Sequence, residues 1–289
     1  MAELSEKSAR MLLASIAEPG DPTLNRLIEA HGAHECLTRH LSPALHSRLE
    51  AAAIAEIIDT SAAMGLQFIT PEDDHWPTGL NSLGETRPLG LWVYGQLDAL
   101  RLPSVAVVGA RSSTHYGEWA AADIAAGIAA AGWCVVSGGA YGIDAAAHRG
   151  ALAANGTTIA FLAGGVDVAY PRSNEMLFRA ITETGALVSE SPPGAQPLRH
   201  RFLVRNRLIA AASLATVVVE ARLRSGASAT ASHAASLGRD VMAVPGAITS
   251  AASAGCHQLI RDGAVLVTSA ADVFELVGGD LPRHASNLE

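Results

Sequence analysis

The sequence predicts an α/β fold, in which a doubly wound and mostly parallel sheet follows a small all-helical domain. Three short apolar runs carry the prediction of the sheet, at residues 105–110, 134–139 and 158–165. Each run is too short for a helix, rich in β-branched residues and closed by a glycine turn, which is typical of buried parallel strands. An alanine-rich segment of helical length follows each run, as in a doubly wound sheet. Because such sheets bind ligands at the carboxyl ends of their strands, we expect the functional residues in these glycine loops.

Residues 1–64 predict the helical domain. Apolar residues recur there at helical spacing, for example at Met11, Leu12 and Ile16, and prolines interrupt the pattern at residues 19–22 and at Pro43. The turn at residues 18–22, EPGDP, resembles a degenerate helix-hairpin-helix turn, a motif that contacts DNA phosphates through backbone amides. Its two acidic residues favour packing or a partner role over contact with DNA.

Residues 65–280 predict the sheet domain. Its first part, residues 65–103, contains strand-like pieces among prolines and glycines, and we expect these pieces to add one or two edge strands. After the three apolar runs, further strands are expected at residues 186–190, 215–220, 240–246 and 264–268. Helices are expected at residues 116–131, 144–154, 173–184, 206–212, 227–237 and 270–277. Residues 281–289 are expected to form a flexible tail.

Composition indicates a reducing compartment and argues against a bound metal and a membrane span. The 289 residues carry a net charge of −8, which argues against a non-specific coat on nucleic acid. Cys36, Cys134 and Cys256 lie far apart with no metal-ligand spacing, so we expect a reducing compartment and no bound metal. The acidic start of the chain is unlike a secretory signal, and no apolar run has the roughly 18 residues of a membrane span. We therefore expect a cytoplasmic protein without membrane association.

The loop after the first apolar run, GARSSTHYG, lacks the glycine pattern of a dinucleotide site. Arg111 stands where the second glycine would let a pyrophosphate approach. Arg111, Ser112 and two further hydroxyl residues instead precede a helix, where free N–H groups, hydroxyls and a guanidinium suit a phosphate oxygen. The alternative is a hydroxyl side chain that caps the helix beside a surface arginine.

The loop after the second run, SGGAYGID, places Gly138 and Gly139 where another backbone can approach closely. Asp144 and His148 follow, four residues apart on one helix face. That spacing suits acid–base chemistry or a metal, but an aspartate at a helix start is more often a cap, and such a histidine more often packs against its neighbours. We favour the structural roles and expect no catalytic residue.

Arginines gather in the second half of the sheet domain. Six of them lie between residues 199 and 224, against one acidic residue, Glu220. No Walker A lysine and no activated nucleophile accompany them, so several phosphate contacts without a reaction centre favour a phosphodiester chain over a single nucleotide. With aromatic residues at only 4%, we expect contacts mainly to the backbone and tolerance of base sequence. A solvated arginine face is the alternative.

As a set, these segments resemble the DNA-processing protein A family, also called Smf. The resemblance covers about residues 66–277 and rests on VAVVGARSS, SGGAYGIDAAAHRGAL, GGVDVAYPRSN, RFLVRNRLIAA, VVVEARLRSGASATA and GCHQLIRDGAVLVTS, in this order. It implies an extended Rossmann-like domain preceded by a SAM-like helical domain. It also implies a non-enzymatic homodimer without a cofactor, which binds and protects single-stranded DNA and helps to load the RecA recombinase in natural transformation and recombination.

The motifs and the resemblance together assign residues. The DNA-binding set is Arg111, Ser112, Gly138, Gly139, Arg172, Arg199, Arg205, Asn206 and Arg207. The last three belong to one basic pocket and are expected in part to brace its loops. The resemblance implies a dimer and RecA surface at residues 256–266, with His257 and Leu266 as the positions to test. Leu203 and Tyr141 depart from the proline and the basic residue that are common in the family, so the affinity of the pocket is open.

Two other functions remain open. One is a nucleoside-monophosphate phosphoribohydrolase of the LOG-like Rossmann group, although the glycine loops here lack the glutamate of that group's PGGxGTxxE motif. The other is an interaction scaffold without a DNA site. Release of free adenine from AMP would indicate the first, and failure to bind labelled oligo-dT would indicate the second.

Overall fold

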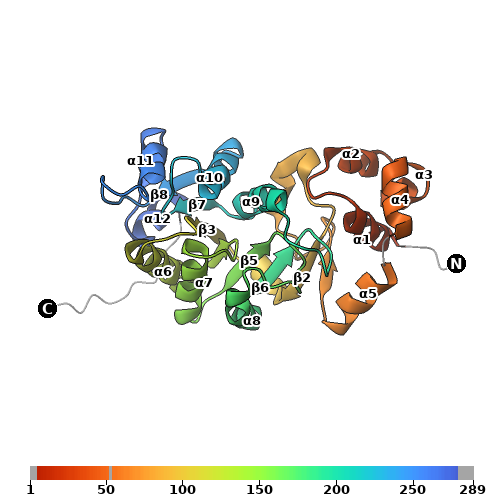
Figure 1. Cartoon of the computed structure of the whole chain (residues 1–289), viewed down its shortest axis with the longest axis horizontal. Helices are drawn as coiled ribbons and strands as arrows, with labels where there is room; N and C mark the ends of the chain where they lie inside the picture. The colour runs from red at the N-terminus through yellow and green to blue at the C-terminus, as the bar shows by residue number, and fades with distance from the viewer. Residues whose placement is uncertain (1–4, 52–53, 279–289) are drawn as a thin grey trace.

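A computed structural model of the chain describes residues 5–51 and 54–278. Its first helices gather at one end of the molecule, in red and orange in Figure 1. They are α1 (Glu6–Ile16), α2 (Pro22–His31), α3 (Ala33–Arg39), α4 (Pro43–Ala51) and α5 (Ile54–Ala63). The helical region expected ahead of the sheet is therefore confirmed, while its boundary at residue 64 stays a prediction. The tail predicted at residues 281–289 lies outside the described residues.

A 9-stranded sheet follows within the described residues, in the order β1-β2-β6-β5-β4-β3-β7-β8-β9. Its strands are β1 (Gln67–Ile69), β2 (Leu91–Gly95), β3 (Ser104–Val108), β4 (Cys134–Ser137), β5 (Thr158–Leu162), β6 (Ala186–Ser189), β7 (Ala215–Val218), β8 (Asp240–Ala243) and β9 (Val265–Leu266). β2 pairs antiparallel with β1 and β6, and every pair from β6 to β9 is parallel. The mostly parallel, doubly wound sheet and its added edge strands are thus confirmed.

Helices cover both faces of the sheet. They are α6 (His115–Ala130), α7 (Ile143–Ala153), α8 (Glu175–Thr184), α9 (Arg199–Ala212), α10 (Gly226–Ser236), α11 (Ala254–Arg261) and α12 (Ala270–Val277). Because successive side chains of a strand point to opposite sides, Val105 and Val107 of β3 pack with α6, α7 and α12, whereas Ala106 and Val108 pack with α9 and α10. None of the helices in the described ranges is long and apolar enough to cross a lipid bilayer.

Small residues allow α6 and α7 to pack closely. A Cβ atom on Gly150 of α7 would lie 2.2 Å from the carbonyl oxygen of Ala122 on α6, so only glycine permits this approach. The alanine-rich composition of both helices therefore allows their close packing. Because β3 and β4 are parallel, the loops that lead from them into α6 and α7 lie at one edge of the sheet.

Two helices differ from the sequence prediction. α9 begins at Arg199, whereas the sequence predicted that the helix would begin at residue 206. Arginine and leucine are good helix formers, and Arg201 pairs with Glu18 of the α1–α2 turn at 3.4 Å, so the basic segment forms the first turns of the helix. α11 was not predicted.

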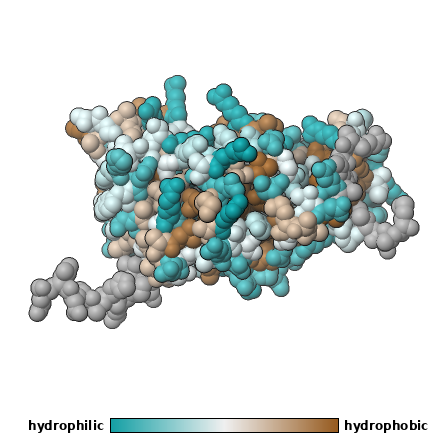
Figure 2. Space-filling model, turned by 60° about the horizontal axis from the view of Figure 1, so that its bottom comes forward, coloured by the Kyte–Doolittle hydropathy of each residue, from teal (hydrophilic) through white to brown (hydrophobic). Residues whose placement is uncertain are grey.

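The α1–α2 turn contacts α9 while remaining partly exposed to solvent. Besides the Glu18–Arg201 pair, the Gly20 N–H donates to Glu190 at 3.1 Å, just beyond the end of β6. The packing role expected for this turn is supported by these contacts. The outer surface is mixed, and Figure 2 shows a face on which hydrophilic side chains project beside hydrophobic ones.

Candidate nucleic-acid interface

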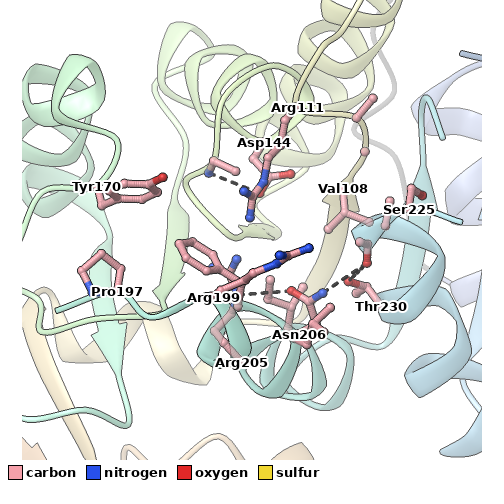
Figure 3. Close-up of a pocket in the computed structure, with 18 residues that line it drawn as sticks. Val108, Arg111, Asp144, Tyr170, Pro197, Arg199, Arg205, Asn206, Ser225 and Thr230 are labelled. Carbon is pink, nitrogen blue, oxygen red and sulfur yellow. Dashed lines mark hydrogen bonds between the residues drawn. The ribbon is translucent and has the colours of Figure 1, made fainter. Parts of the chain in front are cut away.

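A pocket of about 570 Å³ opens at the carboxyl ends of β3 and β7 (Figure 3). The loop after β3, the segment leading into α10 and one side of α9 form its walls. β3 lies between β4, which follows it in the chain, and β7, so this edge is the topological switch point where doubly wound sheets bind ligands. The pocket therefore lies where the strand pattern predicted a site.

Two exposed arginines reach this pocket from different elements. Arg111 belongs to the β3–α6 loop and Arg199 to the first turn of α9. Figure 3 shows both side chains extending toward the space between these elements. Because guanidinium groups bind phosphate oxygens through strong, charge-assisted hydrogen bonds, the pair can hold a ligand with phosphate groups.

Aromatic rings line the same pocket. The Arg111 guanidinium carbon lies 4.7 Å from the centroid of the Phe202 ring, a cation–π contact that orients the arginine. The Tyr170 and Phe202 ring centroids are 5.5 Å apart, and exposed Tyr141 borders an adjoining small hollow that Arg111 also lines. The low aromatic content led the sequence analysis to overlook Tyr170 and Phe202. Their position inside the arginine motifs YPRSN and RFLVRN was the signal that would have found them.

Arg205 supports the pocket from beneath. Its guanidinium donates to the carbonyl oxygens of Gly138, at 2.7 Å, and Phe161, and its Nε donates to Asn206 Oδ1 at 3.3 Å. Burial lowers the pKa of Arg205 to about 10, so it still carries its charge at neutral pH. A Cβ on Gly138 would lie 2.6 Å from the Arg205 guanidinium, so the close approach expected of this glycine loop is made by a side chain of the protein itself.

Asp144 is buried at the pocket wall and does not pair with His148. Its carboxylate accepts the Ala140 N–H at 3.3 Å, and burial raises its pKa against the opposing effect of Arg205. His148 Nδ1 instead donates to Thr158 Oγ1 at 2.7 Å, because that hydroxyl itself donates to the Val135 carbonyl. His148 is therefore a packed histidine, as the sequence favoured. The cap favoured for Asp144 is wrong, because Gly142 is the N-cap of α7 and the Asp144 carboxylate instead binds the preceding loop at the Ala140 N–H.

Buried His148 makes stability depend on pH. Burial lowers its pKa to about 3, so below the ordinary value of about 6.5 the unfolded chain takes up a proton that the folded protein excludes. The contribution of neutral His148 to the free energy of unfolding is fully present above about pH 6.5 and is lost as the pH falls toward 3. Between about pH 7 and about pH 5 this loss is about 2 kcal/mol. When the pH is lowered over this interval, the free energy of unfolding of His148→Asn should fall by about 2 kcal/mol less than that of the wild type, as measured by urea unfolding. Equal losses would contradict the assignment.

The N-terminus of α6 is already occupied within the fold. Thr114 Oγ1 accepts the Gly117 N–H at 3.1 Å, and buried Glu220 accepts both the Thr114 N–H, at 2.9 Å, and its hydroxyl, at 2.6 Å. A Cβ on Gly117 would lie 2.3 Å from the Glu220 carboxyl carbon, which keeps this position a glycine. The capping alternative therefore describes this helix end, and in this loop it is Arg111 that reaches the pocket.

The remaining predicted DNA-binding residues lie in several environments. Ser112 is exposed beside Arg111, and Gly139 turns its loop at a φ of 66°. Arg172 lines a different hollow, beyond Tyr170, with Val168 and Phe178. Arg207 is buried and donates to both oxygens of Glu190 at 2.8 Å, and to the Thr86 carbonyl. Arg111, Arg199, Arg205 and Asn206 thus share one pocket, whereas Arg172 and Arg207 do not join it.

The two positions expected on the dimer and RecA surface lie at the β9 edge of the sheet, in blue in Figure 1. Leu266 of β9 is 49% exposed, so its side chain is available for contact. His257 of α11 is half-buried, and its Nε2 lies 3.1 Å from the Gly246 carbonyl. Both residues therefore lie at one end of the molecule, and the N-terminal helices lie at the other end.

The fold and the pocket define a doubly wound α/β ligand-binding protein with arginines at its topological switch point. The chain belongs to the family described as DNA recombination-mediator protein A, whose sequence profile it matches over residues 67–278. It is 46% identical over 303 residues to a Mycobacterium tuberculosis protein provisionally named DNA processing protein DprA, covering 96% of this chain and 78% of the relative.

Solved structures of DNA processing protein A have the same fold. The structure from Streptococcus pneumoniae superposes with a TM-score of 0.83 at 32% identity, over 95% of this chain and 98% of that chain. The structure from Helicobacter pylori, described as revealing a unique mode of single-stranded DNA binding, gives a TM-score of 0.65 at 28% identity, over 72% and 94% of the two chains. The family resemblance and the extended Rossmann-like fold are thereby confirmed.

Proposed function

We propose that this protein binds single-stranded DNA along its sugar–phosphate backbone, in the pocket between Arg111 and Arg199, and acts in DNA recombination and natural transformation. The observation that carries the proposal is the convergence of two exposed arginines, from separate elements, on one open pocket at the sheet's switch point. Membership of the recombination-mediator family and the single-stranded DNA described for the Helicobacter pylori relative support it.

The chemistry of the pocket favours an unpaired strand. The two arginines suit phosphates of any base sequence, while Tyr170 and Phe202 offer ring faces for base stacking. A base in a duplex has both faces covered by its neighbours, so stacking of this kind requires a single strand. Binding is therefore proposed to tolerate base sequence and to discriminate against duplex.

The other predicted residues take supporting parts in this proposal. Arg205 and Asn206 line the pocket, the loop of Gly138 and Gly139 holds Arg205 through the Gly138 carbonyl, and Arg207 braces α9 against Glu190. Ser112 and Arg172 extend the contact surface along the strand, each outside the central pocket.

We propose further that the protein acts without catalysing a reaction, as a cytoplasmic homodimer. Loading of RecA is assigned to the surface of residues 256–266, where Leu266 is exposed. No feature of the described residues favours the phosphoribohydrolase alternative. Incubation with AMP is its direct check, and release of free adenine would replace the proposal with that enzyme.

Fluorescence anisotropy with labelled oligo-dT, competed by unlabelled duplex of equal length, tests the proposed function. Tight binding to the single strand and weaker binding to the duplex are expected, because only the unpaired strand offers its bases to the rings. A mixed-sequence oligonucleotide is the matched control and should bind about as well as oligo-dT. Equal affinity for single strand and duplex, or no binding, would contradict the proposal.

A further inference from the structure

A cluster of potential metal ligands lies in the N-terminal helices, on residues to which the proposed function assigns no role. The donor atoms of His31, Glu35 and His40 all lie within 4.8 Å of one another. The two imidazole rings stack with their centroids 4.1 Å apart and their planes 13° from parallel, and His40 Nε2 lies 3.8 Å from Glu35 Oε1. Two imidazoles and one carboxylate therefore lie close together at the surface, and the stacked rings must turn for both to bind one ion.

The backbone holds this cluster in place. His31 is the last residue of α2 and Glu35 lies in the first turn of α3, with Gly32 as the link at a φ of 80°. Glu6 of α1 accepts the N–H groups of Ala33 and, at 3.1 Å, His34, so α1 anchors the start of α3. The sharp α2–α3 junction brings donors from two helices together.

One cation competes for the carboxylate. Arg39 Nη1 lies 3.3 Å from Glu35 Oε1, and their side chains are 74% and 43% exposed. An exposed pair of this kind contributes about 0–1 kcal/mol. It is therefore weak enough for a dication with two nitrogen ligands to displace it.

We propose that His31, Glu35 and His40 form a binding site for a divalent transition-metal ion, best matched by Zn²⁺. Two imidazoles and a carboxylate are a ligand set that Zn²⁺ accepts, with water in the fourth position of a tetrahedral site. Ligand bonds of about 2.0–2.1 Å place the donors of such a site about 3.3 Å apart. The donors therefore have to move closer by side-chain rotation, and the exposure of His31 and the partial exposure of Glu35 and His40 leave their side chains room to turn.

The ion would link the end of α2 to α3. Such a link is absent from the unfolded chain, so binding favours the folded helical region. The site lies in a part of the chain that the proposed DNA contacts do not use, and its test is independent of DNA binding.

Titration of the full chain with zinc sulfate in a calorimeter tests the proposal. One ion per chain is expected, with affinity about tenfold or more weaker in His31→Gln and in His40→Gln, since the loss of even a second-shell partner costs at least that much. Arg39→Gln should bind zinc up to about fivefold tighter, because the competing ion pair is gone. His34→Gln is the matched control and should bind as the wild type does, because its ring is outside the cluster.

Zinc should also raise the melting temperature of the wild type and of His34→Gln, and at the same zinc concentration it should raise that of His31→Gln by less. Circular dichroism shows whether each variant is folded before titration, and Arg39→Gln carries the test if a histidine variant unfolds. Zinc affinity that is equal in the wild type, His31→Gln and His40→Gln would overturn the proposal. An Arg39→Gln variant that binds zinc more weakly than the wild type would also count against it.

Discussion

Replacing Arg207 with methionine is expected to lower the free energy of unfolding by about 3–5 kcal/mol, the largest effect of any single change considered for this protein. Arg207 and Glu190 expose only 6% and 9% of their side chains and form a two-oxygen ion pair at 2.8 Å. Removing the cation leaves the Glu190 carboxylate buried with only the Gly20 N–H as a described donor, and it also removes the donor to the Thr86 carbonyl. Urea unfolding followed by circular dichroism measures the loss.

Two further variants make this result specific. Arg201→Met removes a cation from the same helix, but its partner Glu18 is 49% exposed, so a loss of about 0–1 kcal/mol is expected. Combining Arg207→Met with Glu190→Leu should recover part of the loss, because no unpaired carboxylate then remains. A loss below about 1 kcal/mol for Arg207→Met alone would show that the pair does not brace the fold.

The Arg207→Met variant also distinguishes a role of Arg207 in the stability of the fold from a role in DNA binding. At a temperature where Arg207→Met is still folded, its affinity for oligo-dT should stay close to that of the wild type, because Arg207 does not line the pocket. An affinity loss as large as that of a pocket arginine, in a folded variant, would return Arg207 to the binding surface.

Replacing the pocket arginines should weaken single-stranded DNA binding while leaving the fold intact. Arg111→Ala and Arg199→Ala are each expected to cost about 1–3 kcal/mol of binding free energy, the range for a charge-assisted hydrogen bond to phosphate. Both side chains are exposed and make no ion pair within the described residues, so unfolding should change by no more than about 0.5 kcal/mol. Anisotropy titrations with oligo-dT measure the binding loss.

Arg101→Ala is the matched control for this pair. Arg101 is an exposed arginine just before the amino end of β3, at the opposite edge of the sheet from the pocket. It carries the same charge, so a general loss of attraction would appear in all three variants alike. If Arg101→Ala weakened binding as much as Arg111→Ala, the pocket would have no special part in recognition.

The sequence predicted the sheet well because its strands carry a local signal. β3 is buried on both faces, with Val105 and Val107 on one side and Ala106 and Val108 on the other, and this requires an unbroken apolar run. The glycine loops after these runs predicted a site at the edge of the sheet where the pocket lies. Both signals lie within a few residues, so they are readable without knowledge of long-range contacts.

The roles of the arginines were less readable, since they depend on partners far away in the chain. Arg205 and Arg207 are two residues apart, yet one contacts the Gly138 loop and the other contacts Glu190, and both are buried. The expected helix began only at residue 206, between these two arginines, whereas α9 contains both and turns their side chains in different directions. Arg111 and Arg199 are exposed in the pocket, but the residues next to them in the sequence do not distinguish these exposed arginines from buried Arg207.

The dependence of single-stranded DNA affinity on salt tests the central claim most directly. Each phosphate that a cationic side chain neutralises adds about 0.7 to the slope of log affinity against log salt concentration on a single strand. The Arg111→Ala/Arg199→Ala double variant should therefore show a slope smaller than that of the wild type by about 1.4, whereas Arg101→Ala should keep the wild-type slope. An unchanged slope in the double variant would mean that these two guanidinium groups do not hold the phosphates of the strand.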